Sequence, residues 1–199
     1  MTLRGIDWAV VLGASGCGAA ILAGCVIFTG DTPPLGYLRL ALLALMAAAA
    51  FILDEPAAAA VDATPTPLTR RTAVRATALA APVAVWVLGV LAVEQRTAPT
   101  PTLAMLVEGT GVMAVAVALA ACLRMAGNNA PGDIIASICG AAILAILLLN
   151  PPPQSMPVFP VTEGWAASSA LWASLTLTSV LVTISVSRDR RPHRQRCHQ

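Results

Sequence analysis

The sequence predicts an all-α, polytopic membrane protein, a bundle of six transmembrane helices with its N and C termini in the cytoplasm. Three observations support this prediction: the composition, six long apolar runs and the placement of the arginines. Of the 199 residues, 57% are hydrophobic and 11% are charged, with a mean hydropathy of +0.78. A soluble domain carries about 25% charged residues. This chain therefore has more apolar surface than a water-soluble core buries, which indicates an integral membrane protein.

The six apolar runs have the length of membrane spans. A helix needs roughly 17–25 mainly apolar residues to cross the hydrocarbon layer. The runs cover residues 8–30, 35–53, 76–93, 103–123, 133–149 and 165–186. Backbone polar groups in lipid must be satisfied within each helix, so these runs predict a helical bundle. The transmembrane domain is expected over residues 1–187, followed by a basic tail at 188–199.

The arginines orient the bundle, since cytoplasmic segments carry an excess of positive charge. All twelve cationic residues are arginine. With the N-terminus inside, only Arg39 and Arg96 fall on the outer side. The cytoplasmic arginines are then Arg4, Arg70, Arg71, Arg75, Arg124, Arg188, Arg190, Arg191, Arg194 and Arg196. We expect a multi-pass protein of a bacterial cytoplasmic membrane. Its richness in Ala, Arg and Pro favours a GC-rich genome such as that of an actinobacterium.

The first run allows two interpretations. "ILAGC", residues 21–25, resembles a bacterial lipoprotein cleavage box, and lipidation at Cys25 would remove this span and leave five. The apolar run continues through residues 26–28, where a lipoprotein normally turns polar, so we expect an uncleaved span. In the same run, Ala14 and Gly18, and Gly16 and Ala20, stand four residues apart. That spacing lets two helices approach closely, either within the bundle or between subunits.

The charged interruption "FILDEPAAAAVDATPTPLTRRTAVRATALA", residues 51–80, is the most informative stretch of the chain. By the orientation above, residues 54–75 form a cytoplasmic loop. Asp54 can cap a short helix, with Glu55 in its first turn and "AAAAVDA" in its body. "TPTP" then ends that helix, because a residue before proline avoids the helical region. "LTRRTAVR" starts a new helix whose arginines we expect at the membrane surface.

This order of acid, short helix, "ATP" step and basic run resembles the first cytoplasmic loop of type-2 ABC exporter permeases. The matching residues are Glu55, the helix 57–62, "ATP" at 63–65, and Arg70 with Arg71. Six spans with both ends inside are similar to that family, as is a longer outer segment between spans five and six, here residues 150–164. The loop, read as "LDxPAA…P…RR", also resembles loops of actinobacterial ABC-type membrane proteins. The family's loop helix is usually Leu-rich, whereas this one is Ala-rich.

The resemblance implies that the loop docks on a separate cytoplasmic ATPase subunit. Glu55, Asp62, Arg70 and Arg71 would then be the coupling residues, and a second membrane subunit, identical or related, would complete the transporter. The chain has no GxxxxGK[ST] loop, so ATP and Mg would be bound by the partner. We expect no cofactor or metal in this chain, and no catalytic motif identifies it as an enzyme. A plain solvated connector is the other interpretation of the loop.

Glu108 is the one acid well inside an apolar run, "TLAMLVEGTGVMAVAVALAAC" at residues 102–122. Ionisable groups at membrane depth are costly and tend to be paired or functional. Arg39 lies at a similar depth near the outer end of span two, so the two side chains could form an ion pair. A solute or proton site is the alternative. Gly109 and Gly111 beside it are expected to allow a kink or close packing.

Three functions remain open from the sequence. The first is the membrane subunit of an ABC-type transporter that moves a hydrophobic or amphiphilic compound or peptide. The second is a proton-coupled secondary transporter that uses Glu108. The third is a membrane scaffold or regulatory subunit that transports nothing. The basic tail at 188–199 is explained by attraction to anionic lipid, and no nucleic-acid partner is expected.

Overall fold

The computed structural model describes residues 6–28, 35–54, 74–96, 101–128, 130–149, 159–160 and 163–187. Over these residues the regular elements are helices, as predicted. They are α1 (Trp8–Phe28), α2 (Leu35–Phe51), a 3-10 turn (Thr77–Leu79) continued by α5 (Ala80–Glu94), α6 (Thr102–Met125), α7 (Pro131–Leu149) and α8 (Trp165–Ser187). The helix that contains the 3-10 turn begins at Val74. Each predicted run corresponds to one helix, with ends that agree within two residues.

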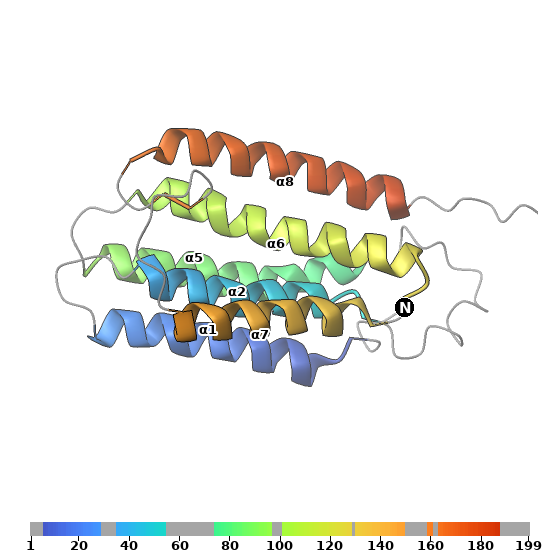
Figure 1. Cartoon of the computed structure of the whole chain (residues 1–199), viewed down its shortest axis with the longest axis horizontal. Helices are drawn as coiled ribbons and strands as arrows, with labels where there is room; N and C mark the ends of the chain where they lie inside the picture. The colour runs from blue at the N-terminus through green and yellow to red at the C-terminus, as the bar shows by residue number, and fades with distance from the viewer. Residues whose placement is uncertain are drawn as a thin grey trace, which may run out of the picture.

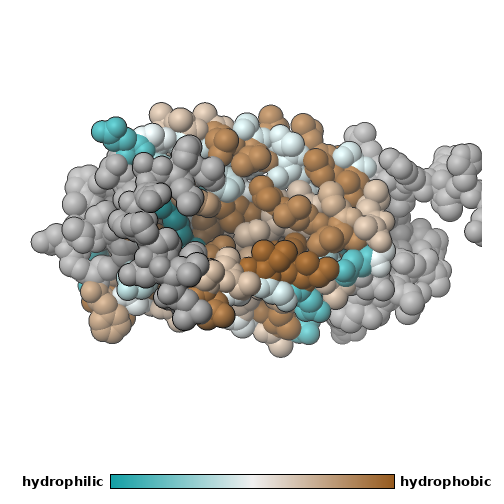
Figure 2. Space-filling model, in the orientation of Figure 1, coloured by the Kyte–Doolittle hydropathy of each residue, from teal (hydrophilic) through white to brown (hydrophobic). Residues whose placement is uncertain are grey.

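Four of these helices are long and apolar enough to cross a membrane: Trp8–Phe28, Val74–Glu94, Thr102–Met125 and Trp165–Ser187. The other two, α2 and α7, are shorter apolar helices. Large apolar side chains such as Leu88, Leu103 and Leu177 are more than half exposed on the outside of the bundle. Figure 2 shows apolar residues over the middle of one face and hydrophilic ones toward its two ends. This surface is compatible with a protein that sits in lipid.

Two helices, α2 and α6, form the centre of the bundle (Figure 1). Helix α2 packs against α1, α5, α6 and α7, and α6 packs against α2, α5, α7 and α8. Helix α8 lies on the outside along α6, and its buried residues are Trp172 and three serines. The central position of α2 follows from its small side chains: Ala48, Ala49 and Ala50 are fully buried, and alanine lets neighbouring helices approach closely.

Glycines set the closest helix contacts. A Cβ added to Gly109 would lie 2.0 Å from Trp86 Nε1 of α5, and one added to Gly111 would lie 2.8 Å from the Trp172 ring of α8. Both glycines therefore serve close packing, one of the two roles expected for them. In α1, Gly18 faces Leu45 of α2, whereas Gly16 has no neighbour within 4 Å of an added Cβ. Among these small residues of the first run, Gly18 therefore serves a close contact within the bundle.

Candidate functional site

The first polar site, the Glu108 cluster, comprises Arg39, Glu108, Phe159, Pro160 and Trp172. Arg39 Nε of α2 lies 3.1 Å from Glu108 Oε1 of α6, and its Nη2 lies 3.5 Å from Oε2. Nη2 also donates to the Pro160 carbonyl at 2.7 Å. The ion pair expected from the similar depth of the two residues is therefore present. It joins the two central helices to the chain segment that precedes α8.

Aromatic rings close this cluster. The Arg39 guanidinium lies 5.2 Å from the centroid of the Phe159 ring, and that ring lies 5.6 Å from the Trp172 ring. Glu108 is 2% exposed, and the Arg39 side chain is 19% exposed. A cation over an aromatic face adds to the ion pair where water is excluded. The cluster can therefore hold a charged pair at depth and fix residues 159–160 against the bundle.

The second polar site, the Asp54 cluster, comprises Leu53, Asp54, Arg75, Arg124 and Gly132 and lies at the other end of the helices. Arg75 Nη1 donates to the Asp54 carbonyl at 2.7 Å and to the Leu53 carbonyl at 3.3 Å. Arg124 Nη1 donates to the Leu53 carbonyl at 3.4 Å. The Asp54 carboxylate accepts the Gly132 backbone N–H at 2.7 Å. The cluster thus ties together α2, α6, α7 and the helix that begins at Val74.

Helix ends explain why these residues come together. The last carbonyls of a helix lack partners within it and carry partial negative charge, which favours arginine. Leu53 and Asp54 follow the last turn of α2, and their carbonyls receive the two arginines. The first N–H groups of a helix favour an acid. Pro131 has no N–H, so Gly132 offers the first one of α7, and Asp54 accepts it.

Asp54 has a partner that the sequence did not indicate: its Oδ1 accepts the Gly132 N–H, 78 residues away. The helix that Asp54 was expected to cap falls outside the described residues. Arg75, which we expect at the membrane surface, lies in the first turn of its helix and is buried in the cluster, 7% exposed. Capping rules look for a partner within a few residues. Here the packing of α7 against α2 brings a distant helix start to the carboxylate.

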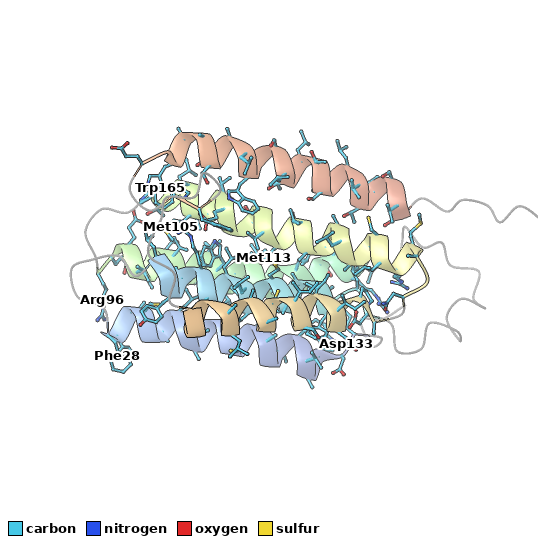
Figure 3. All side chains as sticks on the ribbon, viewed as in Figure 1. Phe28, Arg96, Met105, Met113, Asp133 and Trp165 are labelled. Atoms are coloured by element: carbon cyan, nitrogen blue, oxygen red, sulfur yellow. The ribbon has the colours of Figure 1, made fainter. Side chains whose placement is uncertain are left out.

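The Asp54 carboxyl group, which lies beyond the end of α2, has a perturbed acidity. Burial raises the pKa of Asp54 from 3.8 to about 6, and the neighbouring Asp133 acts in the same direction. The Gly132 N–H, Arg75 and Arg124 oppose this rise. Figure 3 shows Asp133 at this end of the bundle, while Arg96 and Trp165 lie at the opposite end. The Asp54 cluster is therefore able to change its charge in a mildly acidic range.

Stability should respond to this pKa. Between pH 3.8 and about 6 the folded chain binds more protons at Asp54 than the unfolded chain, so its stability falls as the pH rises through that window. We expect the stability of the wild type relative to Asp54→Asn to be about 2–3 kcal/mol greater near pH 4 than near pH 7. The unfolding free energies of the two proteins, measured in detergent at pH 4 and at pH 7, give this difference. Asp133→Asn should lower the pKa of Asp54 and so narrow the pH range over which stability changes. A stability difference between wild type and Asp54→Asn that does not vary with pH would contradict the raised pKa of Asp54.

The structure does not describe the residues expected to couple to an ATPase. Glu55, Asp62, Arg70 and Arg71, together with the short helix 57–62, fall outside the described residues, as do most of the segment 150–164 and the tail 188–199. The nearest described residues on either side of segment 55–73 are Asp54, a member of the Asp54 cluster, and Val74, which precedes Arg75. Cys25 is buried within α1, which continues to Phe28. Within the described ranges, no three metal-ligating side chains gather.

The Asp54 cluster was not predicted from the sequence, although a signal for it exists. Arg75 and Arg124 each stand at the cytoplasmic end of a predicted span, next to the point where span two ends at "LD". Buried arginines at such ends could have been paired with the free carbonyls of span two. Comparison with family models, curated proteins and solved structures finds no match to this chain. The resemblance to ABC exporter permeases therefore rests on residues 54–71 and on the pattern of spans.

Proposed function

We propose that this chain is the transmembrane subunit of an ABC-type exporter in a bacterial cytoplasmic membrane. Its six helices all span the bilayer, with both termini in the cytoplasm. A separate ATPase, which binds ATP and Mg, docks on loop 54–75, and a second membrane subunit, identical or related, completes the transporter. The cargo is a hydrophobic or amphiphilic compound or peptide.

The observation that carries this proposal is the Asp54 cluster at the base of the loop. Arg75 donates to the carbonyl of Asp54 across 21 residues, so the two ends of segment 55–73 are held together. The neighbouring Leu53 carbonyl accepts a hydrogen bond from Arg124 at the end of α6, and the Asp54 carboxylate accepts one from Gly132 at the start of α7. Capping of helix ends favours each of these bonds singly. Together they suit a loop that receives force from a partner, because its base must not yield before the helices move.

Charge reversal in the loop tests the proposal. We expect Glu55→Arg, Asp62→Arg and Arg70→Glu, combined in one variant, to abolish co-purification of the ATPase in mild detergent, since like charges would then face each other at the docking surface. The change is large because several contacts are inverted at once. Arg96→Glu, an exposed arginine at the opposite end of the bundle, is the matched control. An ATPase that binds the triple variant as it binds the control excludes docking at this loop.

The proton-coupled alternative has one observation in its favour: Glu108 is a buried acid in a predicted span. Both of its oxygens lie within 3.5 Å of Arg39, so the carboxylate is already engaged in an ion pair between two helices. We therefore place it second. Under this alternative transport would need no ATPase, and Glu108→Gln would remove pH-dependent transport. A scaffold subunit would tolerate both this substitution and the loop reversal.

A further inference from the structure

The Asp54 cluster has a geometry that exceeds what a helix cap requires. Its hydrogen bonds run in series: Arg75 holds the carbonyl of Asp54, and the carboxylate of Asp54 holds the first N–H of α7. Arg124, at the end of α6, joins through the Leu53 carbonyl. One residue, Asp54, therefore bonds both to the helix that follows the loop and to the helix that follows α6.

The contact at α7 is tight. A Cβ added to Gly132 would lie 2.5 Å from the Phe51 ring, 2.6 Å from Asp54 Oδ2 and 2.8 Å from Phe51 Cα. A backbone atom at that distance leaves no slack, so the start of α7 cannot slide over the end of α2 without moving Asp54. Helix α7 also has few neighbours, since among the described helices it packs mainly on α2 and α6. Displacement of its first turn would therefore be opposed mainly by these two helices.

We propose that the Asp54 cluster is the mechanical link that transmits movement of loop 55–73 to the turn between α6 and α7. This inference rests on the proposed function, because docking of the ATPase supplies the movement. Arg75 and Asp54 are positioning residues in this scheme and touch no cargo. Displacement of the loop pulls its anchor at Arg75, the anchor shifts Asp54, and Asp54 shifts the first turn of α7.

The link can be tested on the purified full-length chain without its partner. Arg75→Leu removes the anchor, and we expect hydrogen exchange of the amides at residues 132–135 to become at least about tenfold faster, the change that corresponds to losing a hydrogen bond of ~1.4 kcal/mol. Arg96 follows the other end of the helix that contains Arg75, so Arg96→Leu is the control and should leave the exchange of these amides unchanged. Equal exchange in the two variants would overturn the link.

A second measurement uses the complex with the ATPase that co-purifies from native membranes. Spin labels at exposed Leu12 of α1 and Ile134 of α7, in a chain whose native cysteines are replaced, report the position of α7. In the labelled chain with no further substitution, we expect ATP to change the distribution of distances between the two labels. In Asp54→Ala the ATPase should stay bound but ATP should no longer change this distribution. In the control Asp133→Ala, ATP should change it as in the chain with Asp133.

The two failures are distinguishable. If no ATPase binds the unaltered chain, the proposed function is wrong and the inference falls with it. If the ATPase binds and α7 moves equally in the chain with Asp54 and in Asp54→Ala, the proposed function stands and the link is wrong. Should Asp54→Ala not fold, Asp54→Asn serves in its place. Its amide oxygen can still accept the Gly132 N–H as a neutral acceptor, so we expect a reduced distance change, and an undiminished one would overturn the link.

Discussion

Replacing Glu108 by leucine is expected to destabilise the folded chain by about 3–5 kcal/mol, because it leaves the Arg39 guanidinium without its carboxylate at a depth where water is scarce. Arg39 would keep its hydrogen bond to the Pro160 carbonyl and its contact with Phe159, neither of which carries a full negative charge. The unfolding free energy in detergent, compared with that of the wild type, measures the loss.

The double variant Arg39→Met, Glu108→Leu is the control for this prediction. A buried ion pair is costly to break from one side, whereas its replacement by apolar groups of similar volume is often close to neutral. We expect the double variant to recover most of the stability that Glu108→Leu loses. A double variant as unstable as the single one would mean that the loss came from altered packing rather than from an unpaired charge.

Substitution of Gly109 by alanine is expected to cost about 3 kcal/mol or more. The added Cβ would lie 2.0 Å from Trp86 Nε1, and Trp86 is fully buried. Its indole N–H donates to the Met105 carbonyl at 3.2 Å. Relief of the clash must move the ring, so the cost of overpacking, about 1–3 kcal/mol, is joined by that of a weakened buried hydrogen bond. Thermal unfolding followed by tryptophan fluorescence reports both effects.

Gly140→Ala is the matched control for this substitution. Gly140 lies in helix α7, and an added Cβ would meet no atom within 4 Å. Alanine is favoured over glycine in a helix by roughly 1 kcal/mol, so the control should be as stable as the wild type or more stable. If Gly109→Ala behaves like Gly140→Ala, the close contact between α5 and α6 does not depend on Gly109.

The two polar clusters have a common physical origin but different visibility in the sequence. Arg39 and Glu108 are charges inside apolar runs, and the cost of an unpaired charge in lipid predicts that they pair. Asp54, Arg75 and Arg124 stand at the ends of runs, where charges are ordinary. Their burial and their bonds to backbone atoms depend on how the helices pack, so position along the chain places them at the ends of predicted spans but does not reveal which atoms they bond.

The sequence alone determined the helical class and the positions of the helices, because a long apolar run in lipid has only the helix in which to satisfy its backbone. It also offered the Arg39–Glu108 pair, beside a solute or proton site, and close packing at Gly109 and Gly111, beside a kink, and the structure shows the pair and the packing. Only the tertiary structure decided that α2 and α6 are central and that Asp54 bonds to a helix start 78 residues away. Such contacts depend on the packing of whole helices, which no short stretch of the chain encodes.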